Sequence, residues 1–94
     1  MDERVIKEWI ENKMPELVEA LKQICRIRSV AETENPSCKP YGEGCKMVLR
    51  DMLQTGKDSG FSTENFEDYV GRISYPGRKK ENIAIWAHLD VVDE

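Results

Sequence analysis

The chain has 94 residues, a net charge of −4 from 14 basic and 18 acidic residues, and a hydrophobic share of 39%. A chain of this length forms one small domain at most and buries only about two-thirds of the surface that its unfolded form exposes. The one basic run is Arg78, Lys79 and Lys80. We expect this run at a solvated turn tip, and the lack of a wider basic face argues against a nucleic-acid partner. No apolar stretch approaches the ~18 residues of a membrane span, and the N-terminus reads as a charged helix rather than a signal sequence, so we expect a cytoplasmic protein.

The three cysteines are odd in number and lack CxxC spacing: Cys25, Cys38 and Cys45. This pattern argues against a disulfide framework, and nothing pairs the single histidine with a nearby thiol in a structural zinc site. We therefore expect free thiols.

The N-terminal residues 2–27 carry one apolar stripe at three- and four-residue steps, which predicts an amphipathic helix whose stripe belongs to the core. The stripe comprises Val5, Ile6, Trp9, Ile10, Met14, Leu17, Val18, Leu21, Ile24 and Cys25. Pro15 removes an amide donor within this pattern. The sequence therefore predicts either a kink at Pro15 or two helices in series.

Residues 31–44 contain two prolines and two glycines among polar residues and read as a loop. A second helix is expected over residues 42–56, with Gly56 as its C-terminal stop. Its apolar face comprises Cys45, Val48, Leu49, Met52 and Leu53. Tyr41 and Gly42 either line a substrate cleft or fill the loop, and loop filling is the better supported alternative.

Three strands are expected after Gly60, over residues 61–66, 68–75 and 82–88, with Pro76 and Gly77 forming a hairpin turn between the last two. The third strand is apolar on both faces, which is typical of a strand inside a sheet that helices cover on both sides. The predicted fold class is therefore α/β. Two helices followed by three strands of a mixed sheet make residues 1–94 a single unit, with no repeat and no internal domain boundary.

His88 is the only histidine, and it ends the third predicted strand two residues before Asp90. In an extended segment, residues i and i+2 point to the same side with Cα atoms roughly 7 Å apart. A ligating imidazole commonly donates its second ring N–H to a carboxylate, which fixes the tautomer and raises ligand basicity. The pair thus fits a metal ligand, His88, held by Asp90. From spacing alone, the alternative is a hydrogen-bonded histidine at a strand boundary.

The final residues, AIWAHLDVVDE, resemble the first metal-site motif of the M20 family of zinc-dependent peptidases and dipeptidases, an apolar strand that ends in HxDVV. Asp93 stands where a proline often follows. The segment RIRSV at residues 26–30 and the order of elements also resemble the start of an M20 catalytic domain. The resemblance covers essentially the whole chain, but only the HxD motif is specific.

The resemblance implies that residues 1–94 form the N-terminal, incomplete part of a catalytic domain that hydrolyses peptide or amide bonds. It implies two zinc ions, a bridging aspartate and a glutamate general base in the complete protein, with His88 as metal ligand and Asp90 as its catalytic support. The other metal ligands and the base lie outside this chain, and the substrate-binding residues stay unassigned. Because a catalytic zinc needs about three protein ligands, we expect the isolated chain to be inactive and to retain no stoichiometric zinc.

The substrate class and the enzymatic character leave alternatives open. The ending HLDVVDE looks most like the bacterial dipeptidase branch, whereas M20 relatives also include deacylases and amidohydrolases that act on acyl amino acids. The chain could instead be a small, non-catalytic α+β interaction module. Such a module should leave no large apolar patch exposed, whereas an incomplete domain should expose Trp86 and self-associate.

Overall fold

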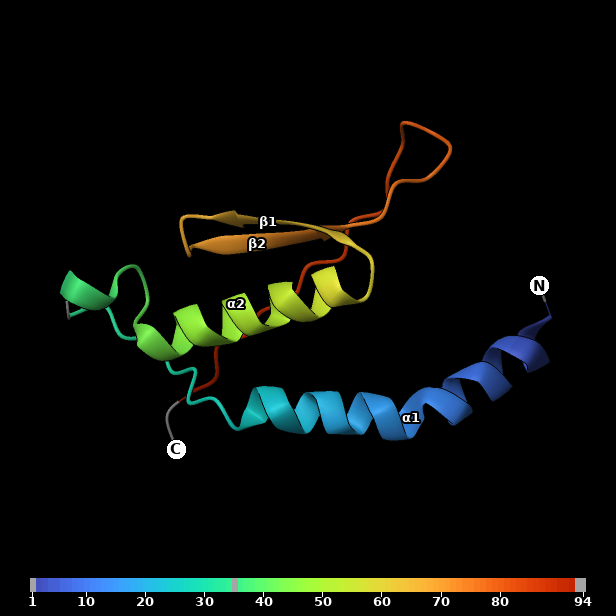
Figure 1. The fold of residues 1–94 in the computed structure, drawn as a ribbon, viewed down its shortest axis with the longest axis horizontal. Helices are drawn as coiled ribbons and strands as arrows, with labels where there is room; N and C mark the ends of the chain where they lie inside the picture. Colours follow the sequence, from blue (N-terminus) through green and yellow to red (C-terminus); the bar gives the residue numbers. More distant parts are fainter. Residues whose placement is uncertain (1, 35, 93–94) are drawn as a thin grey trace.

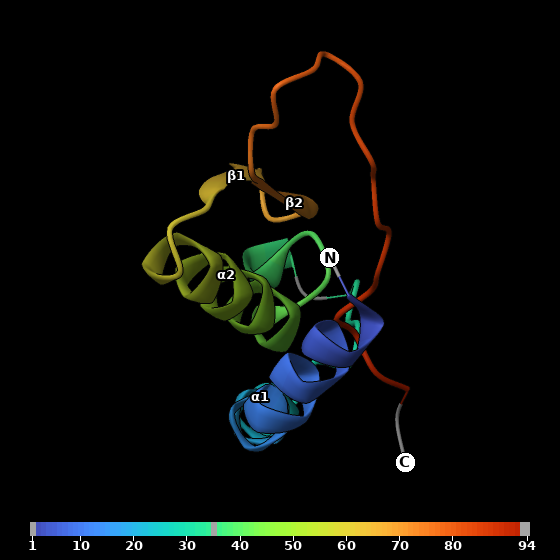
Figure 2. The ribbon, with the colours of Figure 1, turned by 90° about the vertical axis from the view of Figure 1, so that its right-hand side faces the viewer.

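The structure, a computed structural model, describes residues 2–34 and 36–92. Helix α1 (Glu3–Cys25) is followed by a short 3-10 helix, η1 (Pro36–Cys38), helix α2 (Glu43–Asp58) and the strands β1 (Ser62–Phe66) and β2 (Val70–Ser74). The two strands form an antiparallel sheet, and α2 lies between this sheet and α1 (Figures 1 and 2). The described part of the chain is thus a small α+β arrangement with two strands, and the prediction of a three-stranded sheet is wrong.

Helix α1 begins where the side chain of Asp2 accepts a hydrogen bond from the Arg4 amide at 2.9 Å, an N-cap that satisfies one of the free amides of the first turn. The helix continues through Pro15, so the alternative of two helices in series is wrong. Its axis changes direction between the N-terminal turns and the remainder (Figure 1). None of the described helices has the length and apolar character needed to cross a bilayer.

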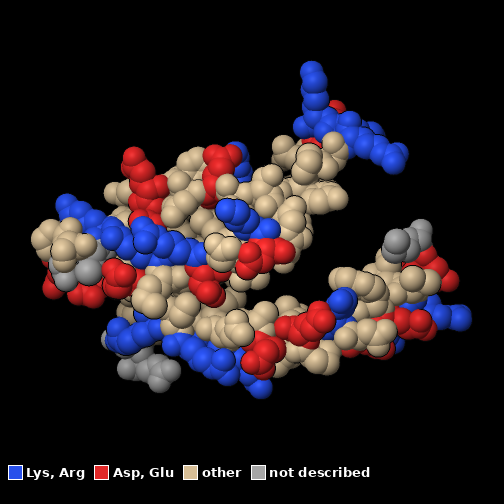
Figure 3. Space-filling model, in the orientation of Figure 1, with Lys and Arg blue, Asp and Glu red and all other residues tan. Residues whose placement is uncertain are grey.

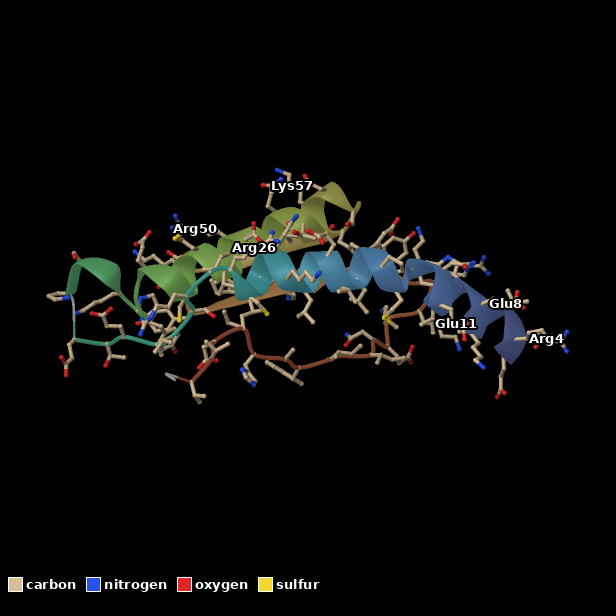
Figure 4. All side chains as sticks on the ribbon, turned by 90° about the horizontal axis from the view of Figure 1, so that it is seen from below. Arg4, Glu8, Glu11, Arg26, Arg50 and Lys57 are labelled. Carbon is tan, nitrogen blue, oxygen red and sulfur yellow. The ribbon has the colours of Figure 1, made fainter. Side chains whose placement is uncertain are left out.

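The apolar stripe of α1 does not form a core. No residue of α1 is buried, and its large apolar side chains, such as Trp9 and Leu17, are exposed. The N-terminal turns, which carry Arg4, Glu8 and Glu11, extend past the end of α2 (Figure 4). Amphipathic spacing identified the helix correctly, but the stripe is left largely open in the described part of the chain.

Helix α2 supplies the small core that the structure has. Val48 is 1% exposed and Leu53 is also buried, and both belong to the apolar face expected from the sequence. Gly56 does not end the helix, as was expected, but lies buried within it. A Cβ atom at Gly56 would lie 3.0 Å from Cδ1 of Ile73, so this glycine allows β2 to approach α2 closely.

Helix α2 ends at Asp58, two residues after Gly56, in a Schellman motif. Gly60 adopts a φ of +94°, and its amide donates to the Lys57 carbonyl at 3.0 Å. The Phe61 amide donates to the Gly56 carbonyl at 3.0 Å. These two bonds satisfy carbonyls of the last turn, which otherwise lack partners.

The hairpin pairs Ser62 with Ser74 and Phe66 with Val70. Its strands are shorter than the predicted 61–66 and 68–75, because residues 67–69 form the turn. Glu67 and Asp68 adopt positive φ angles of 56° and 64° there. Such angles favour glycine or asparagine, so the turn has no obvious sequence signature.

Residues 82–88 run extended but join no sheet, and Pro76 and Gly77 lead into an excursion rather than a hairpin. In Figure 2 this segment descends well away from β2, and the described residues provide no other strand for it. A strand exists only with a neighbour to receive its hydrogen bonds. The segment therefore leaves Ile83 (94% exposed), Ile85 (90%) and Trp86 (87%) in solvent.

The basic run at residues 78–80 lies at the tip of the excursion and is exposed, as expected. Figure 3 shows the Lys and Arg side chains gathered there, away from the rest of the molecule.

Candidate functional site

The structure brings His88 and Asp90 together. The His88 Nδ1 atom lies 3.0 Å from the backbone oxygen of Asp90 and 3.3 Å from its Oδ1 atom. The nearer acceptor is thus the backbone carbonyl, whereas the sequence predicted the carboxylate. Both oxygens favour a tautomer with the proton on Nδ1. The side chains are exposed, 85% for His88 and 54% for Asp90, and no described residue hydrogen-bonds to Nε2. Nε2 is therefore the nitrogen available to a ligand.

Both residues of this pair line an open hollow of about 410 Å³. Four parts of the chain line the hollow: the loops on either side of η1, helix α2, the start of β2 with its preceding turn, and residues 87–90. The lining residues are Ala31, Tyr41, Cys45, Val48, Leu49, Asp68, Tyr69, Val70, Gly71, Ala87, His88, Leu89 and Asp90. The wall is mostly apolar, with a few polar groups near His88, as in many small-molecule sites.

Tyr41 lines the hollow and Gly42 does not, and a substrate cleft at these residues stays a prediction. Its ring packs edge-on against that of Tyr69, with centroids 5.6 Å apart. Gly42 is buried and adopts a φ of +101° just before α2. Tyr41 is therefore held at the wall by a neighbouring ring, and nothing in the local sequence pattern pointed to this contact.

Asp68 also lines the hollow, but its carboxylate is already engaged. Arg50 donates to it through Nε at 3.1 Å and Nη2 at 2.9 Å, and Asn65 donates at 2.9 Å. The hydrogen bond from Arg50 is the largest cause that holds the pKa of Asp68 below its usual range, followed by that from Asn65. Asp68 therefore stays ionised as a structural brace of the hairpin turn, and its oxygens are not free for a metal.

Cys45 lines the same hollow as the pair. Burial raises the pKa of Cys45, and the negative charge of Asp90 adds to this effect. The thiol is accordingly protonated at neutral pH, and its S–H donates to the Ser29 carbonyl at 3.5 Å. Cys45 and the exposed Cys25 are free, as expected. The side chain of Cys38 and residue Asp93 lie outside what the structure describes.

The described residues contain no complete metal site. Among the described side chains, which do not include that of Cys38, no three from His, Cys, Asp or Glu come together in a way that could hold an ion. His88 could fill a single position in a zinc coordination sphere, because Asp90 engages Nδ1 and no described residue hydrogen-bonds to Nε2.

Comparison with known proteins links the chain to dipeptidases. It is 35% identical over 81 residues to the "Putative dipeptidase YtjP" of Bacillus subtilis strain 168, which covers 85% of this chain and 17% of that protein. It is 33% identical over 87 residues to the Beta-Ala-Xaa dipeptidase of Lactobacillus delbrueckii subsp. lactis, or 92% of this chain and 18% of that protein. A relative from Staphylococcus epidermidis with a dipeptidase name is 31% identical over 87 residues.

The chain thus spans about a sixth of the length of these curated relatives. No family model and no solved structure matches it. The similarity covers nearly the whole chain and therefore includes most of the elements described above.

Proposed function

We propose that these 94 residues form the N-terminal part of the catalytic domain of a zinc-dependent, M20-like dipeptidase, in which His88 is a metal ligand and Asp90 holds its imidazole. The observation that carries the proposal is the presence of His88 in the lining of the hollow, with Nδ1 beside two oxygens of Asp90 and no described residue hydrogen-bonded to Nε2. Similarity to dipeptidases over 85–92% of the chain supports it.

In this proposal, residues of this chain orient the His88 imidazole, and the rest of the enzyme completes the metal site. Asp90 keeps the proton of His88 on Nδ1, so that Nε2 is the basic nitrogen that binds the ion. Zinc, when bound, supplies Lewis-acid chemistry that polarises a peptide carbonyl and makes a hydroxide nucleophile accessible near neutral pH. The apolar wall beside His88, including Tyr41 and Leu49, would exclude water from one side of the substrate.

The exposure of the C-terminal segment favours this proposal over a self-contained interaction module. A module of this size should bury its large apolar side chains, yet Ile83, Ile85 and Trp86 are almost fully exposed. A segment that is apolar on both faces fits an interior strand of a larger sheet.

The test uses the protein expressed from the complete reading frame that carries these residues. His88→Ala should lose one zinc ion and nearly all hydrolysis of dipeptides, and Asp90→Asn should weaken zinc affinity by about 10–100-fold. Lys79→Ala, at the exposed tip of the excursion, is the matched control and should leave both unchanged. A His88→Ala protein with full zinc content and full turnover would show that the proposal is wrong.

The 94-residue chain by itself provides a second test. One imidazole binds zinc weakly, so the purified chain should hold no stoichiometric zinc and hydrolyse no dipeptide. One equivalent of tightly bound metal, measured by elemental analysis, would contradict the assignment of the missing ligands to other parts of the protein.

A further inference from the structure

Ser29, in the loop that follows α1, is bonded to both chain neighbours of Asp90. Its hydroxyl donates to the Leu89 carbonyl at 3.0 Å, across 60 residues of sequence. Its own carbonyl accepts the Val91 amide at 3.0 Å. Val30, the next residue, forms an isolated parallel bridge with Val91. Asp90 is therefore fixed from both sides by contacts to one short loop segment.

Ser29 is itself held firmly. It is 2% exposed, which makes it the one buried polar side chain among the described residues. The Cys45 thiol, on α2, donates to the same Ser29 carbonyl at 3.5 Å. Gly44 lets the first turn of α2 approach the loop, because a Cβ atom there would lie 1.8 Å from the Arg28 carbonyl oxygen. The loop is thus wedged between α2 and residues 89–91.

The position of Asp90 in turn determines the position of the His88 imidazole. The His88 Nδ1 atom lies within hydrogen-bonding reach of the Asp90 backbone oxygen, and that oxygen lies between the two bonds to Ser29 along the chain. A shift of Leu89 or Val91 would rotate this peptide and carry the imidazole with it. The second contact of the ring, with the Oδ1 atom at 3.3 Å, also comes from Asp90.

We propose that Ser29 is a positioning residue for the metal site, whose hydroxyl and carbonyl fix Leu89 and Val91 so that Asp90 presents the Nε2 atom of His88 to the ion. This inference rests on the proposed function, because it assumes that His88 binds metal. It concerns a residue that neither touches the ion nor reacts.

The experiment compares Ser29→Ala, Ser29→Cys and Ser59→Ala in the protein expressed from the complete reading frame. Cysteine keeps a weak donor of similar shape. Ser59→Ala is the matched control, because its hydroxyl makes an equivalent bond to the Thr55 carbonyl at 2.9 Å, at the far end of α2. Zinc affinity is measured by competition with a chelator, and hydrogen exchange is measured by mass spectrometry on the peptide that covers residues 88–92.

Zinc affinity should fall by about 10–100-fold in Ser29→Ala, by less in Ser29→Cys and not at all in Ser59→Ala. Exchange at residues 88–92 should accelerate in the same order, while the hairpin β1–β2 keeps its protection. Faster exchange at residues 88–92 with unchanged zinc affinity would make Ser29 merely structural and overturn the inference. If Ser29→Ala does not fold, Ser29→Cys decides by the same two measurements.

The two proposals fail in different ways. If His88→Ala binds zinc as the wild type does, the proposed function is wrong and the positioning role falls with it. If His88→Ala loses a zinc ion but Ser29→Ala and Ser29→Cys do not weaken the binding, only the role of Ser29 is wrong.

Discussion

Gly44→Ala tests the close approach on which the geometry of residues 28–30 depends. The new Cβ atom would lie 1.8 Å from the Arg28 carbonyl oxygen and 2.8 Å from its carbon. Cβ atoms essentially never come within 3.0 Å of such atoms, so the peptide must retreat by more than 1 Å. Because the obstacle is backbone rather than a flexible side chain, we place the cost near the upper end of overpacking, about 3 kcal/mol. Alanine recovers at most about 1 kcal/mol of helix propensity. The net expectation is a loss of roughly 2 kcal/mol in the free energy of unfolding.

The assay is urea unfolding of the 94-residue chain, followed by far-ultraviolet circular dichroism. Gly77→Ala is the matched control, because a Cβ atom there meets nothing within 4 Å, and Gly77 has no positive φ. The control should unfold at the same urea concentration as the wild type or slightly above it. If Gly44→Ala proves as stable as Gly77→Ala, α2 does not lie against the Arg28 carbonyl and the reasoning on this loop is refuted.

Three further outcomes are expected. Val48→Ala should lower the free energy of unfolding by about 1.5–3 kcal/mol, because Val48 is 1% exposed. Val92→Ala, at 88% exposure, should lower it by almost nothing. Equal effects of the two substitutions in urea unfolding would contradict the assigned core. Asp68 has a lowered pKa in the folded state because of Arg50, so its contribution is present above the unfolded pKa of ~3.9 and is lost as the pH falls through the folded value. Asp68→Asn should remove that loss, and an unchanged decline of the urea midpoint on acidification would refute the link. Ile85→Lys should reduce self-association of the 94-residue chain in sedimentation velocity experiments, since Ile85 is 90% exposed on an unpaired extended segment. Unchanged sedimentation would exclude this segment as the contact between copies of the chain.

The helices could be predicted from the sequence because their signals are local. Apolar residues at three- and four-residue steps placed one helix at 2–27 and another at 42–56, and the structure has Glu3–Cys25 and Glu43–Asp58. Gly56 misled the prediction because a glycine that allows close packing looks in sequence like one that ends a helix. Only the contact with Ile73, which comes from β2, distinguishes the two roles.

Strand prediction was correct where the partner lies next in the chain and wrong where it does not. The strands β1 and β2 pair across a three-residue turn, so their alternation and their partner are both local. Residues 82–88 are more apolar than either strand, yet in the described structure they pair with neither β1 nor β2. A sequence pattern reports what a segment would bury, not whether the burying surface is present.

In the candidate site, too, the local features could be predicted from the sequence and the long-range contacts could not. The proximity of His88 and Asp90 follows from an i, i+2 spacing and could be predicted, although the backbone oxygen as the nearer acceptor could not. The contribution of Ser29 joins positions 60 residues apart and leaves no local signal. Asp68 lines the hollow and is engaged by Arg50 and Asn65, and no local sequence signal singled out any of these three residues.

In the described part of the chain, hydrogen bonds to another segment fix the residues that follow His88 but not those that precede it. On its C-terminal side, Leu89 and Val91 are bonded to Ser29, whereas residues 82–88 on its N-terminal side join no sheet. A ligand anchored at one end keeps more rotational freedom than one set between two paired strands, and ordering it on binding metal costs free energy. Under the proposed function, a larger sheet that took in residues 82–88 would order the segment before His88 and strengthen zinc binding, which would couple completion of the sheet to completion of the metal site.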